Sequence, residues 1–305
     1  MKSIFKKTRL DSSARGRPPV AIEVSSDGVM GAALSGSDDE SVYAFAPLPQ
    51  GAIVPGIAEQ NIRSAEIVAS AIRSALGKVS PRSRTVTLIL PDPAVRVFVM
   101  EFDALPAKAA EAVPVLKLRL RKMVPFDVEH AAVSYQILTR ESAGCNVLAA
   151  VLPGPILAEY ESAVRAAGYE PGVVLPSSLA ALETIDSIEA ALIASLSPMA
   201  LTTTIANGSD LLLHRTLDLP EEPSLRLAEI QRGIAVAVAY FEDKLQAPPT
   251  KILYSGSYDT AEFAHWIAGM NLHVSDLAPR PQTGVATSLG HASIAGVAGA
   301  LMGAS

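Results

Sequence analysis

The chain has 305 residues, of which 49% are apolar and 18% charged, and its formal net charge is −6. This length exceeds that of a usual single hydrophobic core, so we expect two lobes, and the composition excludes a largely disordered chain. The net negative charge without a basic domain argues against nucleic acid as the main partner, because binding a duplex requires clustered Lys and Arg.

Residues 1–17 carry six basic side chains but no apolar core. They are therefore typical of a flexible basic tail rather than of a secretory signal. Such a tail acts as a solubilising leader, and weak attraction to an anionic membrane surface is the alternative. No stretch reaches the roughly 20 apolar residues that span a bilayer. We therefore expect a cytoplasmic protein.

The next part of the chain is predicted to form strands around one helix. Two apolar runs joined by Ser25-Ser26-Asp27-Gly28 are typical of a β-hairpin. Apolar residues at helical spacing between Ala65 and Leu76 predict a helix, which Gly77 is placed to end. The predicted strands lie at 20–24, 29–34, 42–46 and 85–90.

The segment that follows mixes strands with two helices. Apolar residues recur at helical spacing from Val113 to Val124, and Pro125 ends this helix. Pro114 is expected to kink its first turn or to mark a later start. Basic residues crowd its C-terminal half, where they complement the helix dipole, so they are weak evidence for a binding patch. The other predicted elements are strands at 96–102, 133–138, 147–152 and 173–175 and a helix at 155–167 before Gly168.

The second half repeats this order. Apolar runs at 190–194 and 200–206 precede Asn207-Gly208, a strong hairpin signal. A helix in 3.6-residue register begins near Ser224. Strands at 211–219 and 251–254 and helices at 224–245, 261–268 and 290–302 complete the prediction. Because strands and helices alternate in each half, the pattern indicates an α/β fold.

One segment resembles the signature of the PilM family of type IV pilus assembly proteins. It comprises the helix after Leu105-Pro106, the turn Val124-Pro125-Phe126-Asp127 and the strand with Ser134-Tyr135, where Ser134 stands in place of the family's Asp. Ala167-Gly168-Tyr169-Glu170-Pro171 is similar to the family's Ala-Gly-Leu-x-Pro stretch. The order of elements agrees along nearly the whole chain.

The resemblance implies a two-lobed actin-like fold, a duplicated ribonuclease H-like arrangement related to the divisome protein FtsA. Family members form a cytoplasmic platform and bind the N-terminal tail of the inner-membrane protein PilN, in a groove between the first lobe and an insert subdomain. The implied parts are a tail (1–17), the first-lobe core (18–95), the insert (96–176), a helix returning to the first lobe (177–189), the second lobe (190–289) and a C-terminal helix (290–305).

An actin-like nucleotide site needs two loops whose backbone amides hold phosphates, and an Asp that orients the metal. The family's first loop reads Asp-Ile-Gly-Ser-Ser-Ser-Val-Lys, where this chain has Glu23 at the acid, Ser25 at the glycine and Met30 at the Lys. Ser25, Ser26 and Gly28 could still accept a phosphate. A plain hairpin is the favoured interpretation.

The second loop departs further from the family pattern. Alignment places Ala194 at the Asp and Leu196 at the glycine, and Pro198 follows them. The family's later Gly-Gly retains Gly256 alone. Losing the carboxylate removes a metal anchor, so we expect lost or much weakened nucleotide binding and no cofactor. Bound ATP and Mg²⁺ are the alternative.

No other catalytic or metal site is indicated. The single cysteine, Cys145, cannot form an internal disulfide. The serines have no His in a recognisable motif, so a hydrolase is not favoured, and we expect a protein that is not an enzyme. The five histidines show no spacing typical of metal ligands: His130, His214, His265, His273 and His291.

We expect a scaffold that binds a PilN-like tail through an apolar groove, in which an extended peptide buries side chains and satisfies its backbone. The residues predicted to line or support that groove are Leu116, Leu120, Val124, Phe126 and Tyr135. Ordinary core positions are the alternative for each. Self-association is left open, as are two other functions: an ATP-binding protein whose assembly responds to nucleotide, and the cytoplasmic part of a type II secretion platform.

Overall fold

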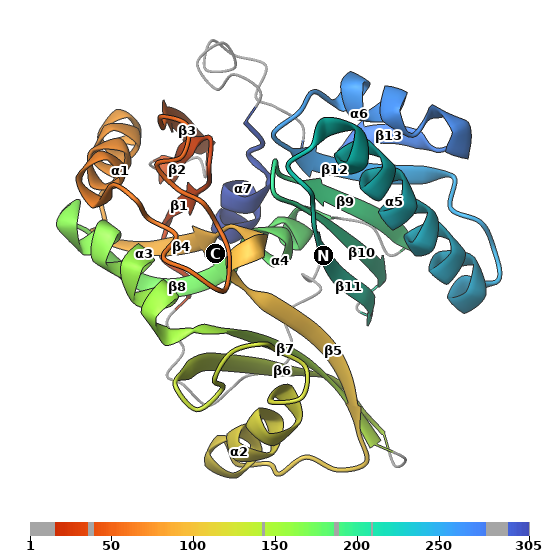
Figure 1. Cartoon of the computed structure of the whole chain (residues 1–305). Helices are drawn as coiled ribbons and strands as arrows, with labels where there is room; N and C mark the ends of the chain where they lie inside the picture. The colour runs from red at the N-terminus through yellow and green to blue at the C-terminus, as the bar shows by residue number, and fades with distance from the viewer. Residues whose placement is uncertain are drawn as a thin grey trace.

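The computed structural model of the chain describes residues 16–35, 40–141, 144–185, 189–208, 210–278 and 292–304. Most of the predicted basic tail and the start of the predicted last helix lie outside these residues. Two five-stranded sheets dominate the fold, one in each lobe (Figure 1). They share one strand order, in which a three-stranded antiparallel meander is followed by two parallel strands.

The first sheet has the order β3-β2-β1-β4-β8. Its strands are β1 (Val20–Val24), β2 (Gly28–Ser35), β3 (Glu40–Pro47), β4 (Thr85–Leu90) and β8 (Glu170–Pro176). The second sheet has the order β11-β10-β9-β12-β13. Its strands are β9 (Ala191–Leu196), β10 (Ala200–Asn207), β11 (Asp210–Asp218), β12 (Lys251–Gly256) and β13 (His273–Asp276). The repeated order confirms the prediction that the second half repeats the first.

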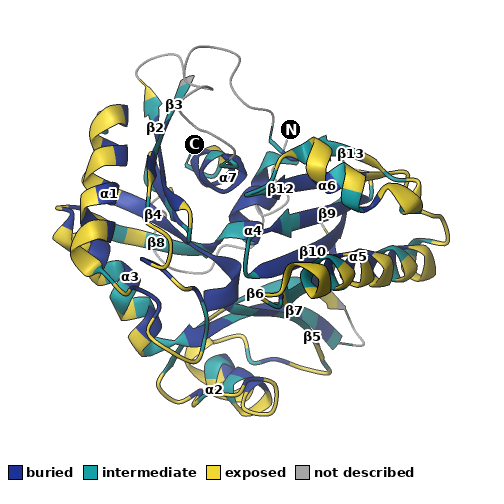
Figure 2. Cartoon of the chain, turned by 45° about the horizontal axis from the view of Figure 1, so that its top comes forward, coloured by how far each residue is buried: buried dark blue, intermediate teal, exposed yellow. Residues whose placement is uncertain are grey.

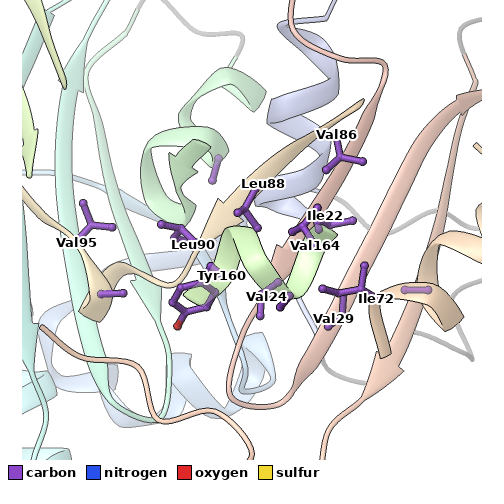
Figure 3. Close-up of a cluster of buried hydrophobic side chains, with 14 of the residues drawn as sticks. Ile22, Val24, Val29, Ile72, Val86, Leu88, Leu90, Val95, Tyr160 and Val164 are labelled. Carbon is purple, nitrogen blue, oxygen red and sulfur yellow. The ribbon is translucent and has the colours of Figure 1, made fainter. Parts of the chain in front are cut away.

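Side chains alternate along β1 and so bury both faces of the first sheet. Ile22 and Val24 pack toward α1 (Ala65–Val79) and α3 (Gly154–Ala166), as Figure 3 shows. Ala21 faces the other side, where α7 (Ala295–Met302) packs together with α4 (Ser177–Ala181). The chain end thus returns to the first lobe.

The second sheet packs one face against α5 (Pro223–Leu245) and α6 (Thr260–Trp266). The outer side of α5 is exposed and the strands beneath it are buried (Figure 2). The register predicted for this helix is confirmed, since Ile230, Ile234 and Phe241 all lie in the core. None of the helices in the described part of the chain combines the length and the apolar character that a membrane span requires.

A third, three-stranded sheet projects below the two lobes in Figure 1. It consists of β5 (Arg96–Phe102), β7 (Gly144–Pro153) and β6 (Ala131–Glu141), in the order β5-β7-β6. The helix α2 (Ala109–Leu120) covers one face with Ala112, Leu116 and Leu120. Pro114 lies inside α2 rather than at its start.

The boundary of this subdomain differs from the predicted insert, which ran to residue 176. β8 pairs in parallel with β4, and α3 packs against α1, so both elements belong to the first lobe. A parallel strand needs a long crossover from its neighbour. Here the third sheet, α2 and α3 together fill that crossover between β4 and β8.

The end of α1 also differs from the prediction. Gly77 lies inside the helix, which continues to Val79, and Ser80 takes the left-handed conformation with φ 49°. A serine at positive φ is strained, because its Cβ approaches the backbone, whereas glycine is not. A side chain at Gly77 would meet no atom within 4 Å.

Replacing Gly77 with Ala should therefore raise the free energy of unfolding by about 0.5–1 kcal/mol, because Ala loses less backbone entropy in a helix. Ser80→Gly should also stabilise the protein, whereas Ser80→Ala should not. Urea denaturation followed by circular dichroism measures all three. If Gly77→Ala destabilised the protein, the helix would have to end where the sequence alone suggested.

Candidate functional site

A narrow cleft lies where the two lobes meet. It is formed by the ends of β1, β4, β9 and β12 and by the start of α7, an edge where parallel sheets usually bind ligands. Its volume is about 90 Å³, below the roughly 300–1,000 Å³ typical of small-molecule pockets. The residues that line it are Glu23, Ser25, Asp27, Met30, Phe45, Pro91, Asp92, Ser177, Ser195, Leu196, Ser197, Ala200, Ser255, Gly256, Ser257, Ala292, Ser293, Ala295 and Gly296.

The two loops that would hold phosphates in an actin-like site are closed by their own serines. The Gly28 amide donates to Ser25 Oγ (3.3 Å), and the Ser25 amide donates to the Gly28 carbonyl (2.9 Å). In the second loop, the Ala200 amide donates to Ser197 Oγ (3.0 Å), and the Ser197 amide donates to the Ala200 carbonyl (2.9 Å). Phosphate binding needs free backbone amides. These amides are already paired, which favours plain hairpins.

The matching bonds of the two loops also fix their alignment. Ser25 corresponds to Ser197, so Glu23 corresponds to Ser195 and not to Ala194, where the sequence comparison placed the lost Asp. Ala194 packs in the core of the second lobe, whereas Ser195 lines the cleft and its hydroxyl lies 3.0 Å from that of Ser255. The second loop still carries no carboxylate at this position.

Glu23 lies on the face of β1 that α7 covers. The Ser177 hydroxyl donates a hydrogen bond to its Oε1, while its Oε2 is buried against Gly296 without a hydrogen-bond partner among the described residues. Burial raises the pKa of Glu23 to about 7; the Ser177 hydrogen bond opposes this shift and the nearby charge of Asp92 adds to it. The carboxyl group is therefore partly neutral near pH 7.

The charge of the cleft disfavours a triphosphate. Among the described residues that line it, none is Lys, Arg or His, while Glu23, Asp27 and Asp92 are acids. Bound phosphates require positive groups or free amides to offset their charge. No cluster of three metal-ligating side chains occurs in the described ranges either. The described lining of the cleft therefore supplies neither a positive side chain nor a cluster of three metal-ligating side chains.

A buried polar chain crosses from the first lobe to the second. Asp92, in the turn after β4, accepts hydrogen bonds from the Ser178 amide (3.0 Å) and hydroxyl (2.9 Å). Ser178 Oγ lies 2.9 Å from Nε2 of His214 on β11. The serine hydrogen points at the carboxylate, so Nε2 of His214 must be the donor. Burial lowers the pKa of His214 although the charge of Asp92 opposes this, so the ring is neutral at pH 7.

An apolar groove of about 180 Å³ lies between the first lobe and the three-stranded sheet. Its lining is apolar except for Ser134, and it contains no charged side chain among the described residues. β8 and β6, which both contribute to it, are end strands of their sheets in the part of the chain that the structure describes. The lining residues are Leu90, Val95, Ala132, Val133, Ser134, Ala150, Leu152, Leu157, Val174, Leu175 and Pro176.

The five predicted partner-binding residues lie elsewhere in the subdomain. Leu116, Leu120 and Val124 are buried between α2 and the three-stranded sheet, and Phe126 and Tyr135 pack against them. They support the sheet rather than line the groove. Of the predicted nucleotide-loop residues, Glu23, Ser25, Leu196 and Gly256 line the cleft, whereas Ser26, Gly28 and Ala194 do not.

Three residues of the polar chain were missed by the sequence analysis. Asp92 follows the predicted strand 85–90, and Ser178 follows the end of β8. Polar residues directly after parallel strands are a usable signal, since such ends meet at one edge. The spacing of the histidines did not single out His214, although a lone His within the largely apolar run 211–219 is a usable signal.

Comparison with known proteins identifies the fold. No family model and no curated protein matches the sequence. Among solved structures, a chain of a "PilM-PilN type IV pilus biogenesis complex" superimposes with a TM-score of 0.75 at 18% identity, over 95% of this chain and 99% of that one.

Two further structures agree less closely. A Bacteroides thetaiotaomicron protein with an actin-like ATPase fold and unknown function superimposes with a TM-score of 0.52 at 11% identity, over 96% of this chain and 99% of that one. The cytoplasmic domain of EpsL, an inner-membrane component of the Vibrio cholerae type II secretion system, superimposes with a TM-score of 0.51 at 13% identity. This match covers 88% of this chain and 92% of that one. The predicted two-lobed actin-like fold is confirmed.

The environment of Glu23 predicts a pH dependence of stability. An acid whose pKa rises from 4.5 to about 7 on folding keeps its proton in the native state, so it costs stability as the pH rises through that window. The loss amounts to about 3 kcal/mol by pH 8. Glu23→Gln mimics the neutral acid and should lack this loss, so it should be more stable than the wild type at pH 8.

Urea denaturation at pH 4.5, 6, 7 and 8 measures the difference between the two proteins. The exposed carboxyl of Glu101 provides the control, because Glu101→Gln makes the same chemical change away from the cleft. Stability curves for the wild type and Glu23→Gln that run parallel over this range would contradict the assignment.

Proposed function

We propose that this protein is a scaffold of a pilus or secretion platform at the inner membrane, and that its groove binds the N-terminal tail of a PilN-like membrane protein. The observation that carries the proposal is the uncharged, apolar groove between the first lobe and the three-stranded sheet. The likeness to a chain from a PilM-PilN complex supports it, and the likeness to the EpsL domain extends it to secretion systems.

The groove suits an extended peptide for two reasons. Its apolar lining can accommodate apolar side chains, whose transfer out of water is favourable. End strands present unpaired amides and carbonyls to which a peptide backbone can add. β8 and β6 both contribute lining residues and end their sheets. A tail with apolar residues at alternate positions is the expected ligand.

The interlobe cleft supports a function without catalysis. Its hairpin amides are paired internally, its lining is acidic and its volume is small. A scaffold needs a rigid body rather than a phosphate site. We infer that the cleft serves as the contact between the lobes, and that the family's nucleotide function is lost in this chain.

Tail binding is tested with a synthetic peptide of the N-terminal cytoplasmic residues of a PilN-like membrane protein. Leu157→Asp places a charge in the groove and should weaken binding at least about tenfold, or 1.4 kcal/mol. Ala132→Phe should weaken it by filling the groove. Isothermal titration calorimetry measures the dissociation constants.

The matched control is Leu118→Asp, since Leu118 is 64% exposed on α2 and lies outside the groove. It should bind like the wild type. Thermal melting followed by circular dichroism verifies that each variant is folded. Equal affinities of Leu157→Asp, Ala132→Phe and the wild type would place the tail elsewhere.

Calorimetry with ATP and Mg²⁺ tests the loss of nucleotide binding. No saturable heat is expected up to about 1 mM nucleotide. The described lining of the cleft contains no Lys, Arg or His, and the amides that close the two hairpins are already paired. Saturable binding that disappeared in a Ser195→Leu variant would show a working site and would favour a nucleotide-responsive protein instead.

A further inference from the structure

The apolar groove and the interlobe cleft share one wall, which consists of residues 90–96 and 174–178. In each segment some residues line the groove and their neighbours line the cleft. The groove side has Leu90, Val95, Val174, Leu175 and Pro176, and the cleft side has Pro91, Asp92 and Ser177. Any shift of this wall must therefore change the shape of the groove.

A first contact joins this shared wall to the second lobe. Asp92 Oδ1 accepts two hydrogen bonds from Ser178, and these tie one segment of the wall to the other. His214 on β11 then donates to Ser178 Oγ at 2.9 Å. All three side chains are buried. Withdrawing His214 would leave buried polar groups unpaired, and such groups are costly.

A second contact between β11 and the shared wall is made by Asp218. The Arg96 guanidinium donates to the carbonyls of Pro93 (3.1 Å) and Val95 (3.4 Å), and it pairs with Asp218 Oδ2 at 2.9 Å. Asp218 is four residues after His214 on β11, so both side chains lie on one face of the second sheet. That face also packs against β5 and the turn after β4.

We propose that β11 of the second lobe clamps the shared wall through His214 and Asp218, so that tail affinity in the groove depends on how the lobes are held together. The occupant of the groove rests on the function proposed above, but the clamp itself does not. His214 is a positioning residue, since it touches the wall and does not line the groove. By linkage, a bound tail stabilises the lobe contact as much as the contact favours the tail.

The clamp is tested first in the free, full-length chain by amide hydrogen exchange. His214→Leu removes the donor and should speed exchange of the amides in residues 90–96 and 174–178 by about tenfold. His214→Gln keeps an N–H at the place of Nε2 and should restore most of the protection. Arg215→Ala is the matched control, because Arg215 lies on the opposite face of β11. Unchanged exchange in His214→Leu overturns the clamp.

The coupling is tested next with the synthetic tail peptide. His214→Leu should weaken binding by about tenfold, His214→Gln by much less, and Arg215→Ala not at all. Asp218→Asn keeps the shape of an exposed side chain and should weaken binding by about threefold, which provides a second variant if His214→Leu does not fold. Affinities within twofold of the wild type in both His214→Leu and Asp218→Asn overturn the coupling.

Failure of the proposed function gives a different pattern. If the wild-type chain binds no peptide, the groove has no tail ligand, and the exchange data still decide whether β11 holds the wall. If the wild type binds and the His214 and Asp218 variants bind equally well, the function stands and the coupling does not.

Discussion

Asp92 accepts two hydrogen bonds from Ser178, and these join the ends of β4 and β8, two neighbouring parallel strands. The interlobe cleft opens on one side of these strand ends and the apolar groove on the other. Because Asp92 and Ser178 are buried, water does not compete for their hydrogen bonds, which hold the segments after β4 and β8 in one arrangement. The geometry of both cavities therefore depends on this pair.

The duplicated fold explains why the two lobes present equivalent hairpin turns at the interlobe cleft. Each lobe begins with a hairpin of the same form, and in each hairpin a serine closes the turn. The fold places both turns at the interlobe cleft, whatever their sequence. To bind a phosphate and its metal, the turns would need free backbone amides, small residues and a metal-binding carboxylate. At these positions this chain has serines, Leu196 and the enclosed Glu23.

The third sheet forms the apolar groove together with the first lobe. α2 seals one face of this sheet with Leu116 and Leu120, so the groove has to form on the side of the first lobe. Because the groove lies between the first lobe and the three-stranded sheet, its shape depends on how these two parts are positioned relative to each other. The contacts of His214 and Asp218 with the shared wall extend this dependence to the second lobe.

The sequence by itself determined the order and type of most elements, because the spacing of apolar residues and the turn residues are local features. The hairpins, the register of α5 and the repeat of the first half in the second all follow from these local patterns. The sequence also indicated that the phosphate loops had changed. β13, a short four-residue strand, was not predicted, and the ends of α1 and α2 were misplaced because Gly77 and Pro114 are tolerated inside helices.

Only the tertiary structure decided which residues meet. Periodicity showed that Leu116 and Tyr135 are apolar positions in regular elements. It did not show that both belong to the core between α2 and the three-stranded sheet instead of the groove lining. The alignment of the second loop slipped by one residue, and in a strand that slip moves a side chain from cleft to core, as it does for Ser195 and Ala194. Asp92, Ser178 and His214 lie far apart in sequence, so their contact arises only when the two lobes pack together, and no local pattern encodes it.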